Sequence, residues 1–386
     1  MDVRRGSYRI GIVMLLTGVG IPVVASALSA PSNVCIDVGG TTVCESRSGP
    51  VKWNPGHYGL AWAGVIKDSF VNKIAKEKYI KGLRMQVYWR QLEPKPGVYD
   101  FSIIEENLSK LQSKGKRLLA MISYKSYNSA GRDMLCAPED IIAAGGTQHR
   151  LNKGGKQHVC VARIWRKDVR DRFISLMKAL GSRFDKEPYF EGVQFQETAN
   201  NGGREDVSEY RKGYNPPYVA GFTQQKYFDA IVEINREAKK AFPHTNVFQM
   251  LNHIQPPSGI RTPEEAMRKL ISALYGVGVG ISDPDLICCS TSPNPAVRVR
   301  SEFVGKLPMS VENQTISKRW SKYRQTPDKA YFAAVDDPKG YHANYVFWWL
   351  HGSNVPELDY GSVINTIERN GGRINTACPA NVQCGS

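Results

Sequence analysis

Apolar runs alternate with amphipathic segments from residue 57 to residue 370. This alternation predicts repeated βα units, in which helices cover a parallel sheet. The predicted strands are Tyr58–Ala63, Gly82–Trp89, Arg117–Ser123, Gly192–Glu197, Asn246–Asn252, Leu286–Thr291, Pro308–Glu312 and Tyr345–Leu350. Segments with apolar residues at helical spacing include Ile103–Lys114, Val169–Phe184, Gln225–Ala241, Pro263–Leu274 and, after the last strand, Gly361–Arg369.

Eight units of this kind close a barrel, so the predicted fold class is α/β, a (β/α)8 TIM barrel. The alternative is an open, doubly wound sheet, but no glycine-rich phosphate-binding turn follows the first predicted strand. The glycine run at 276–280 lies between a predicted helix and Asp283, where we expect a flexible loop. Long segments follow several strands, above all 124–165, and in a barrel such segments build the functional face.

The first thirty residues have the pattern of an export signal. Arg4, Arg5 and Arg9 form a basic start, and Ile10–Val24 is mostly apolar. This short stretch favours a cleaved signal peptide over an uncleaved anchor, so we expect a secreted or periplasmic protein without stable membrane insertion. The predicted division of the chain is a signal peptide (1–30), an N-terminal extension (31–50), a barrel (51–370) and a C-terminal tail (371–386).

Eight cysteines in an exported chain without a CxxC pair favour disulfides over metal ligation. We predict local pairing, namely Cys35 with Cys44, Cys136 with Cys160, and Cys378 with Cys384. Cys288 and Cys289 are adjacent and form either a vicinal bridge or two buried thiols, and the apolar run around them favours thiols. Cys136 and Cys160 would brace the long loop 124–165, which either holds an acidic chain with its lysines or forms a crosslinked rim without a ligand.

The chain is strongly basic, with a formal net charge of +15. The first thirty residues contribute +2, from three arginines against Asp2, which leaves +13 for residues 31–386. Lysine and arginine are spread along predicted helices and no nucleic-acid-binding motif occurs, so a nucleic-acid partner is not expected. What remains is an indication of an anionic polymer or a cell-envelope surface as target. No pattern in the sequence sets an oligomeric state.

Two glutamates are the leading candidates for chemistry. Glu197 ends the fourth predicted strand and Glu312 ends the seventh, and each follows a short apolar run. Both would lie on the barrel face that carries active sites, where partial burial perturbs the pKa of a carboxyl group. Paired carboxylates suggest glycoside hydrolysis, whereas the simpler alternative is that each caps a strand. Glu191 precedes the fourth strand and is expected at the opposite end of the barrel.

The segment Arg84–Phe101, with its Trp89, Glu93-Pro94, Gly97 and Tyr99-Asp100-Phe101, resembles the second-strand segment of retaining glycoside hydrolases of clan A. The resemblance covers residues 57–360. It implies a retaining glycosidase with the general acid/base on strand four and the nucleophile on strand seven. Glu197 would then be the acid/base and Glu312 the nucleophile.

The resemblance also suggests substrate-binding residues. Arg84 would hold the nucleophile ionised, and Trp349 would form the floor beneath the cleaved sugar, with Trp89 as a possible extension of that platform. Asn252 and His253, at the end of strand five, are candidates for binding sugar hydroxyls. Gln196 stands where these families carry Asn before the acid/base and can still offer an amide to a sugar 2-hydroxyl. The strand-six tyrosine of these families has no counterpart in Cys288–Thr291.

The predicted function is therefore an exported glycoside hydrolase that acts on a polysaccharide or oligosaccharide. The alternatives are a catalytically silent glycan-binding barrel, and a lyase or transglycosylase that acts on an anionic exopolysaccharide. No metal or other cofactor is expected, because the seven histidines show neither HxxxH nor HxH spacing. The sequence also lacks a GxSxG motif, which argues against a serine hydrolase.

Overall fold

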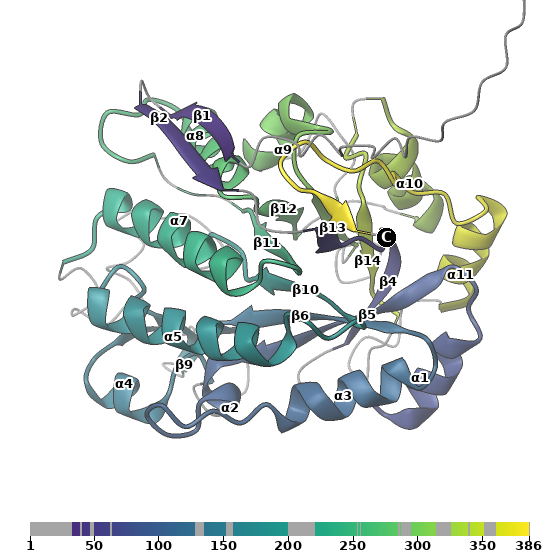
Figure 1. Ribbon diagram of the computed structural model, residues 1–386, viewed down its shortest axis with the longest axis horizontal. Coiled ribbons are helices and arrows are strands. Elements are labelled where there is room, and N and C mark those ends of the chain that lie inside the picture. Colours follow the sequence, from purple (N-terminus) through teal and green to yellow (C-terminus); the bar gives the residue numbers. More distant parts are fainter. Residues whose placement is uncertain are drawn as a thin grey trace, which may run out of the picture. The chain divides into compact units, whose positions relative to one another are not determined.

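Eight parallel strands close into a barrel in the computed structural model of the protein (Figure 1). In order around the barrel they are β4 (Gly56–Ala61), β5 (Ile80–Tyr88), β6 (Arg117–Ser123), β10 (Phe190–Phe195), β11 (Asn246–Met250), β12 (Gly280–Asp283), β13 (Met309–Asn313) and β14 (Tyr345–Trp348), which pairs again with β4. The predicted (β/α)8 barrel is confirmed. The structure describes residues 33–38, 41–46, 50–61, 64–127, 135–151, 157–199, 221–252, 254, 256–284, 286, 295–313, 326–338, 340–350 and 360–385.

The helices that follow the strands cover the outside of the barrel (Figure 1). The longer ones are α1 (Asp68–Ala75), α3 (Ser102–Gln112), α5 (Lys167–Phe184), α7 (Gln224–Ala241), α8 (Pro263–Gly276) and α11 (Tyr360–Arg369). The shorter ones are α2 (Trp89–Leu92), α4 (Glu139–Ala143), α9 (Pro295–Val299) and α10 (Pro327–Tyr331), with a 3-10 turn at Arg300–Phe303 and a π-helical turn at Phe332–Asp336. Threonine side chains start α7 and α8, since Thr223 and Thr262 each accept a hydrogen bond from the third residue after them. No helix in the described ranges is long and apolar enough to cross a membrane.

The sixth strand corrects the sequence prediction. It is β12, Gly280–Asp283, and not Leu286–Thr291. The predicted flexible loop at 276–280 is wrong at its end, because Gly280 pairs with Phe248 of β11 and opens the strand. A Cβ atom at Gly280 would lie 2.7 Å from the Pro308 carbonyl oxygen, so glycine permits the close approach of β13. The apolar run that suggested a strand lies beyond β12, and Cys288 and Cys289 are outside the described residues.

The core has two parts. Apolar faces of the helices pack on the outer face of the barrel, as the buried Phe173, Met177 and Leu180 of α5 illustrate. Inside the barrel a separate cluster forms from Tyr58, Leu60, Leu119, Phe248, Tyr345 and Phe347. Layers of inward side chains fill a TIM barrel in this way, so the polar groups that face inward near its carboxyl end stand out.

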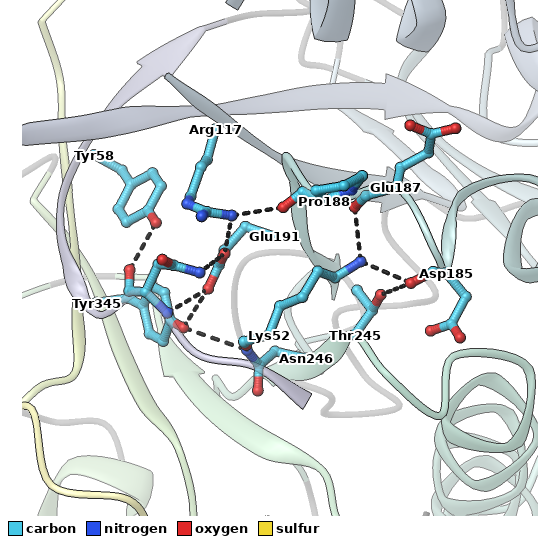
Figure 2. Close-up of polar contacts among 11 residues, drawn as sticks. Lys52, Tyr58, Arg117, Asp185, Glu187, Pro188, Glu191, Thr245, Asn246 and Tyr345 are labelled. Carbon is cyan, nitrogen blue, oxygen red and sulfur yellow. Dashed lines mark hydrogen bonds and ion pairs between the residues drawn. The ribbon is translucent and has the colours of Figure 1, made fainter. Parts of the chain in front are cut away.

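Glu191 lies at the amino end of the barrel, as expected. Figure 2 shows its contacts with Arg117 and Tyr345. Glu191 is fully buried and accepts hydrogen bonds from the Asn54 amide groups and from the Tyr345 hydroxyl, with Arg117 3.4 Å away. Burial raises its pKa, while the hydroxyl of Tyr345 opposes the shift. This arrangement closes the amino end of the barrel, the end associated with stability rather than chemistry.

Disulfides brace two segments outside the barrel. Cys136–Cys160 and Cys378–Cys384 are bonded, which confirms two of the predicted pairs. The first bond belongs to the insertion after β6, where β7 (Lys125–Tyr127), β9 (Gln157–Ala162) and β8 (Thr147–Leu151) form an antiparallel sheet. The second lies in the tail, whose β15 (Cys384–Gly385) pairs with β3 (Val51–Lys52).

A hairpin precedes the barrel. It consists of β1 (Asn33–Val38) and β2 (Thr41–Ser46), and its register sets the backbones of Cys35 and Cys44 opposite one another. The pairing of these two cysteines stays a prediction. The predicted signal peptide lies outside the described residues.

Candidate active site

Glu197 and Glu312 both lie at the carboxyl end of the barrel. Glu197 stands two residues beyond β10, and Glu312 is the fourth residue of the five-residue β13. Strands of a parallel barrel all end on one face, so both carboxylates belong to the face that carries chemistry in TIM barrels. Their surroundings differ. Glu312 is 7% exposed, whereas Glu197 is half-buried.

Each oxygen of the Glu312 carboxylate accepts a hydrogen bond. Arg84 Nη1 lies 2.8 Å from Oε2, and Trp349 Nε1 lies 2.9 Å from Oε1. Arg84 comes from β5 and is 4% exposed, so the ion pair is shielded from water. Two donors in fixed positions set the orientation of the carboxylate. The predicted contact between Arg84 and Glu312 is present.

Further inward-facing polar residues hold the arginine. Arg84 Nη1 also lies 2.8 Å from Gln194 Oε1, and Gln194 Nε2 donates to Ser282 Oγ over 2.7 Å. Burial lowers the pKa of the Arg84 guanidinium, and the Glu312 carboxylate opposes that shift. An arginine stays protonated in proteins despite such shifts. The chain of contacts therefore runs from β12 through β10 and β5 to the nucleophile candidate on β13.

Glu197 has a different partner. Asn252 Nδ2 donates to Glu197 Oε2 over 2.5 Å. The hydroxyl oxygen of Thr198 accepts a hydrogen bond of 3.0 Å from the backbone N–H of Asn252. The same hydroxyl donates to the backbone carbonyl oxygen of Asn252 over 2.7 Å. The structure places the Asn252 side chain against the acid/base candidate, and its predicted contact with sugar hydroxyls stays a prediction. A neutral amide beside a half-buried carboxyl group suits a residue that must exchange protons with substrate.

Gln196 is anchored on both sides. It is 5% exposed, its side-chain oxygen accepts a short hydrogen bond from Ser123 of β6, and its carbonyl oxygen accepts one of 2.9 Å from Gln249 of β11. Gln86 Nε2 in turn lies 3.4 Å from Ser123 Oγ. Because Ser123 occupies the side-chain oxygen, the amide nitrogen is the group suited to the predicted contact with a sugar hydroxyl.

The tryptophans divide between site and core. Trp349 is half-buried and bonds to Glu312, consistent with the predicted floor of the sugar site. Trp89 does not fit its predicted role, because it is 0% exposed and has no surface to offer a sugar. Its ring packs edge-on against Phe173 at 5.0 Å, and its Nε1 donates to Glu93 Oε2 over 2.7 Å. His253 lies outside the described residues.

Known proteins that resemble this chain are glycosidases. The sequence profile of glycoside hydrolase family 42, described as beta-galactosidase, matches residues 69–271, more than half of the chain. The chain belongs to this family. It is thus a TIM-barrel glycosidase of clan A. The matched region contains Arg84, Glu197 and Asn252, while Glu312 and Trp349 lie beyond it and rest on the geometry described above.

Solved structures support the fold of this family 42 protein. The catalytic domain of beta-amylase from Paenibacillus polymyxa superposes with a TM-score of 0.55 at 10% identity, over 85% of this chain and 100% of that chain. The beta-galactosidase from the haloarchaeon Halorubrum lacusprofundi gives 0.51 at 13% identity, over 82% of this chain and 58% of its own. Endo-glycoceramidase II from Rhodococcus sp. gives 0.51 at 12% identity, over 82% and 80% of the chains. No curated protein matches the sequence.

Several polar residues of the site were absent from the sequence prediction. Gln194 and Ser282 support Arg84, and Lys125 and Tyr227 contact the backbone around Glu197. Gln194 carries a recognisable signal, since it shares the face of its strand with Gln196 inside an otherwise apolar run. In the part of the chain that the structure describes, no group of three or more histidine, cysteine, aspartate or glutamate side chains is arranged to hold a metal.

Proposed function

We propose that this family 42 glycosidase is a retaining enzyme in which Glu312 is the nucleophile and Glu197 the general acid/base. The observation that carries the assignment is the contrast between the two carboxylates. Glu312 is buried, ion-paired with Arg84 and fixed by Trp349, as an ionised nucleophile requires. Glu197 is half-buried and accepts a hydrogen bond from a neutral amide, as a group that alternates between acid and base requires.

The proposed reaction has two steps. Glu312 attacks the anomeric carbon while Glu197 protonates the departing glycosidic oxygen, and a glycosyl ester with Glu312 forms. Glu197, now a carboxylate, then removes a proton from water, the water oxygen bonds to the anomeric carbon, and Glu312 leaves. When Glu312 leaves the glycosyl ester as a carboxylate, the positive charge of Arg84 lowers the free energy of this buried negative charge. The Gln196 amide is placed to donate to the sugar, and Trp349 to support it from below.

The substrate is proposed from the family rather than from the site. Since the family description names beta-galactosidases, β-galactosides are the first substrates to test, as free oligosaccharides and within polysaccharides. The net charge of +13 for residues 31–386 supports an acidic polymer as the second class. Turnover of an acidic polymer that falls steeply with added salt would support a role of the charge in capture. The export pattern at 1–30 supports a secreted or periplasmic location.

The roles are tested with Glu197→Gln and Glu312→Gln in the mature protein. We expect both variants to fold, as judged by circular dichroism, and to lose turnover. Glu191→Gln is the matched control. Glu191 lies on β10, the strand that leads to Glu197, but at the amino end of the barrel. This variant should keep turnover. Full activity in both site variants, or inversion at the anomeric carbon by proton NMR, would overturn the proposal. Glycan binding without turnover by the wild type would favour a silent binder.

A further inference from the structure

The backbone that carries Glu197 is held from behind by two buried side chains. Lys125 Nζ donates to the carbonyl oxygens of Glu197, at 2.6 Å, and Ala199, at 2.7 Å. The Tyr227 hydroxyl donates to the carbonyl oxygen between them, that of Thr198, at 2.7 Å. Lys125 Nζ also lies 3.2 Å from the Tyr227 hydroxyl oxygen. Three successive carbonyl groups at the end of strand four thus each have a side-chain donor.

Lys125 is an unusual residue for such a position. It is 0% exposed, as is Tyr227, and its ammonium group lies 5.5 Å and 5.9 Å from the ring centroids of Tyr124 and Tyr227. Removing an ammonium group from water is strongly unfavourable unless hydrogen bonds compensate. Two of the hydrogen bonds of Lys125 go to peptide groups of the acid/base segment. The energy of burying this lysine is therefore coupled to the geometry of that segment.

The same segment is tied to strand five. The Thr198 amide donates to the Met250 carbonyl oxygen over 3.1 Å, and the Thr198 hydroxyl bonds to the backbone of Asn252. Lys125 and Tyr227 fix the segment on its other side. Since Asn252 is also the side-chain partner of Glu197, a shift of this backbone would change both the position of the carboxyl group and its hydrogen bond.

The position of Lys125 depends on the disulfide-braced insertion. Lys125 is the first residue of β7 and pairs with Val161 of β9, and the next residue, Ser126, pairs with Cys160. Cys160 is bonded to Cys136. The insertion therefore supports the site from outside through one buried lysine. The sequence alternatives for this loop were a rim without a ligand and a lysine-rich binding surface for an acidic chain.

We propose that Lys125 is a positioning residue for the acid/base, with Tyr227 as its partner. The ammonium group does not touch substrate, and it acts by holding the peptide groups on either side of Thr198 so that the Glu197 carboxyl group meets the glycosidic oxygen. Misplacement of a reacting group by about 1 Å can cost about 100-fold in rate. This inference rests on the proposed role of Glu197.

Lys125→Met tests the inference, because it keeps the length of the side chain and removes the donors. The substrates are methyl and 2,4-dinitrophenyl glycosides of the sugar that the wild type hydrolyses, β-galactose in our proposal. Methoxide needs protonation as it leaves and dinitrophenolate does not, so a misplaced acid slows the first substrate selectively. We expect kcat/KM to fall about 100-fold for the methyl glycoside and less than about threefold for the dinitrophenyl glycoside.

A second readout follows the base step. With the dinitrophenyl glycoside, kcat should fall and should recover when azide is added. Azide attacks the anomeric carbon of the glycosyl ester, a carbon–nitrogen bond forms, Glu312 leaves as a carboxylate, and no base is needed. A general loss of folded enzyme lowers the activity on both substrates by one factor and gives no azide rescue.

Lys239→Met is the matched control. Lys239 is also buried and also donates to backbone carbonyl oxygens, in its case three, those of Phe242, Pro243 and Thr245. It precedes β11 at the amino end of the barrel, away from the site. We expect lower stability and unchanged leaving-group dependence. Tyr227→Phe removes a single hydroxyl and provides a milder test if Lys125→Met does not fold. It should show the same selectivity at about tenfold.

The inference and the proposed function fail separately. Glu197→Ala should selectively lose activity on the methyl glycoside and should be rescued by azide. A Glu197→Ala variant without these two effects would overturn the role of Glu197 itself. If Glu197→Ala behaves in this way and the folded Lys125→Met or Tyr227→Phe variant loses both substrates equally, or neither, the positioning role of Lys125 is wrong.

Discussion

Replacing Arg84 by methionine should disable Glu312, the proposed nucleophile, without leaving a large cavity inside the barrel. Methionine fills most of the volume of the arginine stem and cannot donate a hydrogen bond. Arg84 Nη1 is the group that contacts Glu312 Oε2 at 2.8 Å, and it also contacts Gln194 at 2.8 Å. In the variant, Glu312 keeps the 2.9 Å hydrogen bond from Trp349 but loses the positive charge beside it.

The size of the effect follows from the burial of the pair. Arg84 and Glu312 are 4% and 7% exposed, so water screens their attraction weakly. With an effective dielectric constant of about 20, unit charges about 4 Å apart attract by about 4 kcal/mol, and breaking a buried pair by removing one partner costs about 3–5 kcal/mol. If that cost falls on the ionised form of the proposed nucleophile, kcat/KM drops by about 100- to 4000-fold, at about 1.4 kcal/mol per factor of ten.

The assay compares kcat/KM and urea unfolding for Arg84→Met and Arg300→Met. Arg300 is also 4% exposed, but its guanidinium donates to the Val297 carbonyl oxygen over 2.5 Å and lies 3.5 Å from the ring centroid of Tyr341. We expect the control to lose stability and to keep kcat within about threefold. Arg84→Met that retains kcat/KM within about threefold of wild type would refute the view that this ion pair maintains the nucleophile.

Three further outcomes follow from single contacts. Asn252→Ala removes the 2.5 Å hydrogen bond to Glu197, and since bonds to charged groups are worth about 1.5–3 kcal/mol, kcat should fall by about 10- to 100-fold. Burial lowers the pKa of His57 to about 4 from 6.5, so the folded state binds fewer protons than the unfolded state between these values. The free energy of unfolding should therefore fall by up to about 3 kcal/mol as the pH drops from 6.5 towards 4, and urea titrations of His57→Gln should lack this slope. Tyr345→Phe removes the 2.7 Å hydrogen bond to the buried Glu191 and should cost about 1.5–3 kcal/mol in urea unfolding with unchanged kcat, because both residues lie at the amino end of the barrel.

The barrel was predictable because most of its strands are apolar runs bounded by clear helices. The position of β12 was not predictable, for a physical reason. Its four residues begin with the last glycine of a glycine run and end with Ser282 and Asp283. A glycine run reads as a loop, whereas Gly280 is required by the close approach of β13. The prediction placed the strand at the more apolar run 286–289, which follows β12 in the sequence.

Side-chain direction explains the error at Trp89. Successive residues of a strand point to opposite faces, so Gln86 and Tyr88 share the side of Arg84, while Trp89 belongs to the other side. It begins α2 and packs against Phe173 of the helical layer. The resemblance supplied the residue type that sugar sites use, and the alternation along the strand already argued against this position.

The support of Glu197 by Lys125 could not be read from the sequence. The contact between Lys125 and Tyr227 joins residues 102 positions apart, and the acceptors of their hydrogen bonds are peptide carbonyl groups, which every residue has. A lysine in a long loop is typical of a solvated surface. Only the three-dimensional arrangement shows that this one is buried.

The central claim is that Glu312 forms a covalent intermediate. The direct measurement is to incubate the enzyme with the 2,4-dinitrophenyl 2-deoxy-2-fluoro-glycoside of its active sugar, which forms the glycosyl ester readily and releases it slowly, and then to map the peptides by mass spectrometry. The account predicts one fluorosugar on the peptide that contains Glu312, and none in Glu312→Gln. A sugar on another carboxylate, or no adduct in an enzyme that turns over the parent glycoside, would contradict it.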